Sequence, residues 1–459
     1  MTEPGLLSGL FTRGPAAHEA DERALAQAMM DVEVALLRAL GHAGIAPSSA
    51  ADELAAIADA STLDLAELGR GAGDNGTPVP ALLSALRLRL GDEAAAHLHQ
   101  GATSQDVVDT ALMLVARRSL VSLLEELGAA ADACAELAER HRAALLPGRT
   151  LLQQALPLTF GLKAATWLSG LDGACAELVE IRERVLAVQL GGAVGTLAAL
   201  GDRGLEVVSD VAAQLGLAEP ALPWHTVRLR PARLSFGLAA ALGAMAKVAR
   251  DVVLLAQTEV AEAHEGGGEG RGGSSTMPHK RNPVGAITVL ACAQRAPGLM
   301  ATMLSAMIQE HERAAGAWQA EWEPLLELLR LAGSAASALR ELLEGLAVDE
   351  QRMGADLELT RELVMSESVA TALAGSLGWP AAQDVVARAA AACTRDGRSF
   401  REVLSQTTEV QRALGRDGLE AALDPRRYLG VSDELVARAL AEHRRVREQV
   451  VSSQPGTGS

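Results

Sequence analysis

The chain has 459 residues, of which 49% are hydrophobic, 22% are charged and only 2% are aromatic. This length exceeds one ordinary core and predicts two to four domains, and the composition excludes a largely disordered protein. A formal net charge of −17 argues against nucleic acid as a partner, because phosphate binding requires a concentrated basic surface. It still permits a small anionic substrate, since a few well-placed cations create a local positive potential in an acidic protein.

Long helical patterns follow one another along the chain, and strand-like alternation is nearly absent. Beyond an N-terminal helical domain over 1–105, apolar residues recur at helical spacing over 106–146, 157–190, 231–264, 283–311 and 324–346. Helices of this length need support along most of their surface, which favours an all-α fold with a central bundle of five long helices. We expect this bundle over 106–347, a C-terminal helical domain over 348–451 and a disordered tail over 452–459.

The sequence carries no recognisable cofactor site. The four cysteines lie far apart, no Cys or His pair has zinc spacing, and neither a Walker loop nor a dinucleotide fingerprint is present. We therefore predict catalysis without a metal or an organic cofactor. The N-terminus is charged rather than apolar and no run reaches the length needed to span a bilayer, so we expect a cytoplasmic protein without membrane contact.

The segment 272–283, GGSSTMPHKRNP, packs two serines, a threonine, a histidine, two cations and an amide into twelve residues. It offers hydroxyls as a nucleophile or base, the Lys280 ammonium for a carboxylate and the Asn282 amide as a donor. A helix N-terminus, whose free N–H groups favour anions, is expected just after it. Upstream glycines make a mobile lid over 266–283 plausible. From composition alone, the segment fits a Gly/Ser turn that leads into a helix equally well.

This string resembles the signature loop G-S-S-x-M-P-x-K-x-N of the aspartase/fumarase superfamily. The resemblance implies an all-α homotetramer, active sites shared between subunits and a small polycarboxylate substrate. By position it implies that Ser274 is the general base, which removes a proton alpha to a carboxylate, and that Lys280 acts beside it. Asn282 would hold the substrate, and Ser275 is the alternative base.

Two further blocks resemble the same superfamily. The string HQGATSQDVVDT is similar to its first signature region, which implies that Thr103 and Ser104 hold a substrate carboxylate and that His99 is catalytic. The turn at 191–195 is similar to the glycine turn that begins the next region. The residues that complete the expected set of substrate contacts are Arg149, Gln153, Ser275, Met277 and Arg313.

Two of these neighbourhoods leave alternatives open. A guanidinium fork suits a carboxylate, but Arg313 fits an ion pair with Glu310 or another nearby acid on a helix surface as well. Arg228 is followed by Leu229, where the superfamily commonly has aspartate, so a substrate role for His225 and Arg228 stays in doubt.

The strings GRTLLQQALPLTFGLK and PWHTVRLR resemble the branch of the superfamily that closes a lactone ring on a carboxylated muconate. Leu151 stands where the adenylosuccinate lyases have a histidine general acid. A departing amine needs a proton and a departing carboxylate does not, so leucine at this position favours the lactone-forming branch, a cycloisomerase. We also expect that Leu151 lies in a pocket shaped for an aliphatic side chain. The alternatives are a C–N or other C–X lyase that releases fumarate from a succinate derivative, and a catalytically silent structural relative.

Overall fold

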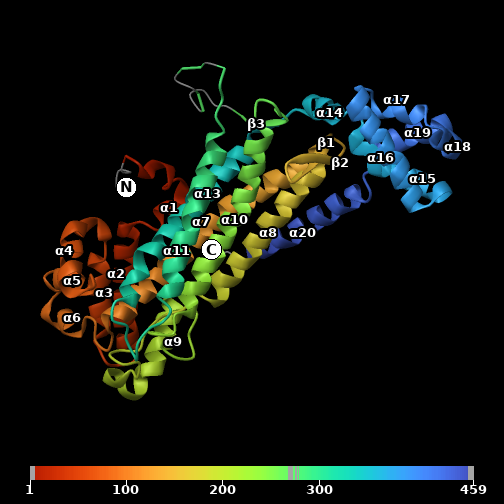
Figure 1. Ribbon diagram of the computed structural model, residues 1–459. Helices are drawn as coiled ribbons and strands as arrows, with labels where there is room; N and C mark the ends of the chain where they lie inside the picture. Colours follow the sequence, from red (N-terminus) through yellow and green to blue (C-terminus); the bar gives the residue numbers. More distant parts are fainter. Residues whose placement is uncertain (1–5, 267–271, 274–275, 278, 453–459) are drawn as a thin grey trace.

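The computed structural model describes residues 6–266, 272–273, 276–277 and 279–452. Five long helices run side by side through its centre (Figure 1). They are α7 (Ser104–Arg140), α8 (Phe160–Arg184), α10 (Leu229–Leu255), α11 (Val284–Ser305) and α13 (Trp322–Glu344). The prediction of an all-α fold with a five-helix bundle is confirmed. Helices α7, α8, α10 and α11 are shorter than their apolar patterns predicted, because the ends of those patterns lie in loops or in a hairpin, whereas α13 has the predicted length and begins two residues earlier.

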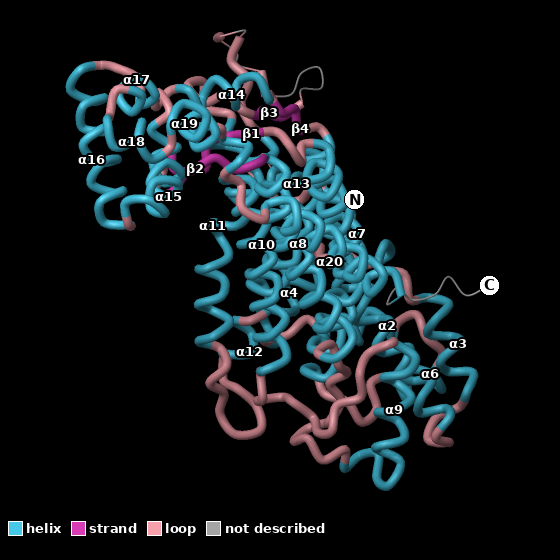
Figure 2. The backbone as a smooth tube through the Cα atoms, turned by 90° about the vertical axis from the view of Figure 1, so that its right-hand side faces the viewer, coloured by secondary structure: helices cyan, strands magenta, loops and turns pink. Residues whose placement is uncertain are grey.

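Smaller helices cover the two ends of the bundle (Figures 1 and 2). Helix α1 (Gly14–His18) packs on the side of the bundle against α13 and α7. At one end lie α2 (Glu22–His42), α3 (Ser48–Ile57), α4 (Leu65–Asn75), α5 (Val79–Arg87) and α6 (Asp92–His97). Helix α9 (Gly204–Leu215) lies beside them, and α12 (Ala317–Ala320) precedes α13. At the other end lie α14 (Glu350–Glu358), α15 (Ser366–Leu377), α16 (Trp379–Asp396), α17 (Phe400–Ser405), α18 (Thr408–Ala413) and α19 (Gly415–Leu423).

The last helix, α20 (Ser432–Ser452), returns to the bundle and packs along α8 and α7. Its Val436, Val446 and Val450 belong to the same apolar core as the bundle and the N-terminal helices, whereas a separate core holds α15–α19 together. The compact C-terminal unit is therefore smaller than the range 348–451 expected from sequence. Most of the tail predicted to be disordered, 453–459, lies outside the described residues.

A β-hairpin joins α7 to α8. It includes residues that the apolar patterns assigned to the end of one helix and the start of the next. Strand β1 (Leu145–Thr150) pairs antiparallel with β2 (Gln153–Thr159), and Leu151 and Leu152 form the tip with φ of 51° and 63°. A two-residue turn with positive φ usually contains asparagine or glycine, so two leucines gave no turn signal. A second antiparallel pair joins β3 (Ala263–Glu265) to β4 (Leu346–Val348).

Helix α11 is long and apolar enough, by length and composition alone, to cross a membrane, and 33% of its most apolar window is buried. The expectation that no run reaches such a length is therefore wrong. The helix packs against α10 and α13 and leaves Ile287 and Leu304 on its exposed side, 46% and 56% accessible. Such an apolar side on a bundle helix fits packing against another chain as well as it fits lipid.

Candidate active site

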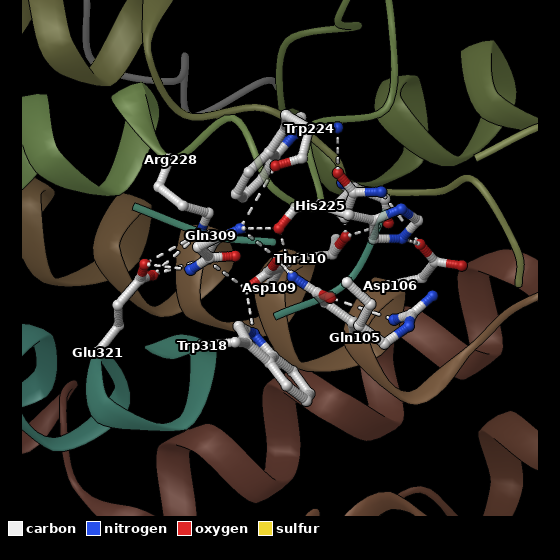
Figure 3. A network of polar contacts seen from close by, with 12 residues as sticks. Gln105, Asp106, Asp109, Thr110, Trp224, His225, Arg228, Gln309, Trp318 and Glu321 are labelled. Carbon is white, nitrogen blue, oxygen red and sulfur yellow. Dashed lines mark hydrogen bonds and ion pairs between the residues drawn. The ribbon is translucent and has the colours of Figure 1, made fainter. Parts of the chain in front are cut away.

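The N-terminus of α7 is tied to the glycine turn by one buried carboxylate. Thr103 is the N-cap residue, and its backbone N–H donates to Oδ2 of Asp106 at 3.0 Å. The backbone N–H groups of Gly191 and Gly192 donate to the same carboxylate at 3.1 and 2.9 Å. Nε2 of His225 lies 2.7 Å from Oδ1 (Figure 3). Asp106 thus brings the partly buried Thr103 and Ser104 next to the turn, as the two sequence blocks suggested.

His99 stands just before this helix, in a turn where the Ala102 N–H donates to the His99 carbonyl. Its Nδ1 lies 2.6 Å from Oε1 of Glu33, which α2 supplies and which is fully buried. Burial alone would lower the pKa of His99, but the hydrogen bond to Glu33 and the charge of that residue raise it above the usual value. His99 therefore keeps its proton to a higher pH than a free histidine does.

Arg313 reaches the same corner from the loop after α11. Its guanidinium donates to Oε1 of Gln105 at 3.1 Å and to the carbonyl of Ala193 at 2.8 Å. The alternative ion pair with Glu310 does not form, since Glu310 accepts the backbone N–H of Ala315 instead. Arg313 lies in a loop rather than on a helix surface, because α11 ends at Ser305. The corner thus combines two cationic groups with a helix N-terminus.

Arg228 belongs to a buried ion network behind this corner. Its guanidinium lies 2.7 Å from both Asp109 and Glu321, and all three side chains are at most 2% exposed (Figure 3). Burial would lower the pKa of Arg228, but the two carboxylates raise it. The indole N–H of Trp318 also donates to Asp109. Arg228 is thus fully engaged by protein groups, so the doubt about its substrate role resolves in favour of a structural one.

The described part of the signature loop forms a closed stem. Gly273 and Arg281 make an antiparallel bridge, and the Asn282 N–H donates to the Gly272 carbonyl at 2.9 Å. Gly272 has φ of +70°, and a Cβ there would lie 2.6 Å from the Asn282 carbonyl oxygen, so only glycine fits. Ser274 and Ser275, the two candidate bases, lie outside the described residues.

Lys280 and Asn282 open onto a cavity of about 600 Å³ beside this stem. His264, Gln257 and the neighbouring His279 also line it. Lys280, like Met277, is exposed in the isolated chain. Glu265 fixes the base of the loop, because its carboxylate accepts the Gly285 and Ala286 N–H groups at the start of α11. The arrangement offers a cation and an amide donor at the base of the signature loop.

The candidate residues of the hairpin do not form a substrate pocket within one chain. Arg149 donates through both terminal nitrogens to the buried Glu262, at 2.8 and 2.7 Å, so its guanidinium holds β1 against the β3 segment. Burial raises the pKa of Glu262 even though Arg149 opposes the shift. Gln153 is exposed, and Leu151 is 97% exposed at the tip. The prediction that Leu151 fills an aliphatic pocket is wrong within one chain.

The candidate residues therefore form two groups at opposite ends of the bundle. His99, Thr103, Ser104 and Arg313 surround the N-terminus of α7, whereas the signature loop and the hairpin lie at the other end (Figure 1). Helix α7 alone has 37 residues, which corresponds to about 55 Å at about 1.5 Å per residue. One chain cannot bring the two groups onto one small substrate.

Among the described residues, no group of three or more His, Cys, Asp or Glu side chains is placed to hold a metal ion. Sequence reasoning missed three residues that organise the site: Glu33, Glu262 and Glu265. Each is a carboxylate in an ordinary helical or short strand context, and its role depends on a partner distant in sequence. No local pattern could have marked them.

Two family models match the chain. A lyase model matches residues 14–298, and a model of the adenylosuccinate lyase C-terminus matches residues 362–439. The first match includes His99, Thr103, Ser104 and the signature loop but ends before Arg313, and the second covers the separate C-terminal core.

Relatives of known name match nearly the whole chain. The 3-carboxy-cis,cis-muconate cycloisomerase of Pseudomonas aeruginosa is 44% identical over 95% of this chain and 96% of its own length. The nitrosuccinate lyase of Streptomyces davaonensis is 42% identical over 96% of this chain and 95% of its own. The crystal structure of the 3-carboxy-cis,cis-muconate lactonizing enzyme from Pseudomonas putida superposes with a TM-score of 0.89, at 39% identity, covering 96% of this chain and 99% of that one.

Proposed function

Because the chain belongs to the lyase family of the aspartase/fumarase superfamily, we propose that it is a cycloisomerase that interconverts 3-carboxy-cis,cis-muconate and 4-carboxymuconolactone. The observation that carries the proposal is the 44% identity to the Pseudomonas aeruginosa cycloisomerase across nearly the full length of both chains. The leucine at position 151, where the adenylosuccinate lyases resembled by this sequence have a general acid, agrees with it.

In the lactonising direction, a carboxylate oxygen of the substrate bonds to one carbon of a double bond. The π electrons move to the neighbouring carbon, form an enediolate with its carboxylate, and take up a proton there. We assign this proton transfer to Ser274, with Ser275 as the alternative. In the reverse direction the serine removes the alpha proton and the carboxylate departs, so it must be held as an alkoxide by nearby cations and amides. Lys280 and Asn282 stand at the base of that loop.

The corner at the α7 N-terminus supplies the carboxylate clamp. Thr103 and Ser104 offer hydroxyls, and His99 and Arg313 offer charge-assisted donors within the same corner. Such donors suit the doubly charged carboxyl group of an enediolate better than the singly charged ground state. Stronger binding of the intermediate than of the substrate is what accelerates the reaction.

We further propose that the active site is completed by other copies of the chain in a cytoplasmic homotetramer. The two candidate groups lie at opposite ends of a bundle whose helix α7 is about 55 Å long. Bundles that pack antiparallel would bring the α7 corner of one copy to the loop and hairpin of others. The apolar outer side of α11 is suited to such packing. In this arrangement, the exposed Leu151 would acquire its pocket from a neighbour.

The second candidate is elimination from nitrosuccinate, because a relative with that name is 42% identical over a similar length. Nitrite, like a carboxylate, is a weak base and departs without a general acid, so Leu151 does not separate the two reactions. Both need a base alpha to a carboxylate and a carboxylate clamp.

Ultraviolet absorbance separates the two candidates. Purified protein mixed with 3-carboxy-cis,cis-muconate should remove the conjugated diene absorbance, while nitrosuccinate, adenylosuccinate and argininosuccinate should yield no appreciable fumarate. A kcat/KM for nitrosuccinate that exceeds the value for the muconate would overturn the assignment in favour of the lyase.

A further inference from the structure

Glu33 is a fully buried carboxylate in the middle of α2, a helix in which the sequence analysis singled out no residue. It lies in α2 among the buried apolar residues Met30, Leu36 and Leu37. Oε1 lies 2.6 Å from Nδ1 of His99, and Oε2 is buried without a hydrogen-bond partner among the described residues. Burying a charge in this way is costly, and a buried ion pair is poor evidence of a stabilising role.

The geometry fixes the state of the His99 ring. An ionised carboxylate only accepts hydrogen bonds, so beside an ionised Glu33 the proton lies on Nδ1 of His99, which donates to Oε1. The ring is held in a turn with a backbone φ of 66°, unusual for a residue other than glycine. Nε2 has no partner among the described residues, and the side chain stays 16% exposed. That nitrogen is left for a ligand at the N-terminus of α7.

We propose that Glu33 is a positioning residue for His99, which it holds with Nδ1–H toward α2 and Nε2–H toward a substrate carboxylate bound at Thr103 and Ser104. The inference rests on the proposed function, since it assigns the carboxylate to the substrate. It extends that function to a residue outside every motif. Glu33 itself lies behind the imidazole and acts through it.

The charges around His99 support a cation at this place. Asp106 at the start of α7 acts with Glu33 to raise the pKa of His99, and Arg87 at the end of α5 opposes them together with burial. Without the charge of Glu33, burial would dominate and favour the neutral ring. A neutral ring with Nδ1–H has a bare Nε2 lone pair, which repels a carboxylate.

The test is the titration of His99 itself, observed in deuterated protein labelled at histidine Cε1. The His99 resonance is assigned from its loss in His99→Gln. In wild type its pKa should lie above the ordinary value of about 6.5, and in Glu33→Gln it should fall by at least about one unit. Asp31→Asn is the matched control, because Asp31 lies on the same helix and pairs with Arg118 away from His99. Its His99 should titrate as in wild type. Unchanged titration in Glu33→Gln would overturn the proposal.

The pH dependence of KM is a second readout, and the loss of a purely structural contact would not shift it. In wild type, KM for the muconate should stay low until the pH rises through the raised pKa of His99. In Glu33→Gln, KM should begin to rise at least about one pH unit lower, with kcat changed less than threefold in the acid range. In a His99→Gln background, Glu33→Gln should have no further effect on the profile, and an equal effect there would overturn the proposal.

Two further outcomes remain decisive. If Glu33→Gln does not fold, Glu33→Asp keeps the charge but shortens the reach, and the pKa of His99 should then lie below its wild-type value; an unchanged pKa in Glu33→Asp would overturn the proposal. Failure of the proposed function is distinguishable from failure of this inference. A wild type whose His99 titrates as expected, yet which does not consume the muconate, refutes the cycloisomerase and leaves the dyad standing.

Discussion

Replacing Arg228 by methionine removes the cation that the buried carboxylates of Asp109 and Glu321 share. The guanidinium makes five contacts of 2.7 to 3.1 Å with these two groups, and none of the three side chains is more than 2% exposed. Methionine preserves most of the aliphatic stem and offers no donor. Both carboxylates would then be buried, like-charged neighbours.

The size of the destabilisation depends on which member of the ion network is removed. Removing one member of a buried, hydrogen-bonded ion pair typically destabilises a protein by about 3–5 kcal/mol, because the remaining charge stays uncompensated. The cost should be local at first, because Asp109 lies on α7 and Glu321 precedes α13. At about 1.36 kcal/mol per tenfold change, opening of the first turns of α7 becomes roughly a hundredfold to several-thousandfold more frequent.

Amide hydrogen exchange followed by mass spectrometry measures this opening directly, in peptides that cover the first turns of α7. Arg233→Met is the matched control, because Arg233 lies near the start of α10, which Arg228 directly precedes, but pairs with Glu180 at 3.4 Å with both side chains more than 40% exposed. An exposed pair contributes less than about 1 kcal/mol. If exchange in Arg228→Met matches the control, the network does not hold this corner and the reasoning is refuted.

Four other outcomes are expected. Burial alone would lower the pKa of His443, but its hydrogen bonds to Asp132 and Asp172 raise it from 6.5 to about 9. The ion pairs of His443 that dock α20 should therefore contribute fully to the folding stability below pH 6.5, and up to about 3 kcal/mol of this contribution should be lost as the pH rises through 9. The thermal midpoint of wild type should fall across that window, and that of His443→Gln should not. Ser274→Ala should lower kcat by about a hundredfold to ten-thousandfold while a tricarboxylate inhibitor still binds by calorimetry; a near wild-type rate would move the role to the next serine. Leu151→His should not accelerate lactonisation, and a clear gain would show that the leaving group needs an acid. Activity should survive exhaustive dialysis against EDTA, and a loss restored by one divalent metal would contradict a metal-free mechanism.

The helical bundle was predictable because its signal is local and repeated. Apolar residues at helical spacing over 25 or more residues specify α7 and α10 without help from the rest of the chain. The hairpin between α7 and α8 was not predictable, since its turn uses Leu151 and Leu152 rather than asparagine or glycine. Helix α20 returns to the bundle because of tertiary contacts, which His443 and its apolar side chains make, and no local sequence pattern in the helix predicts this packing.

The site was predictable to the extent that its residues lie in continuous strings. Thr103, Ser104 and His99 came from one string and do lie together at the α7 N-terminus. Arg149 came from another string, but the structure gives its guanidinium to Glu262. Such pairings join positions more than a hundred residues apart, so only the folded chain reveals which cations are free to meet a substrate.

The most direct measurement is a proton NMR spectrum of the products formed in D₂O from an equimolar mixture of 3-carboxy-cis,cis-muconate and nitrosuccinate. The account predicts loss of the muconate olefinic signals, growth of the lactone signals and one deuteron at the carbon alpha to a carboxylate. Nitrosuccinate should remain. A spectrum in which the fumarate singlet grows while the muconate signals persist would contradict the assignment.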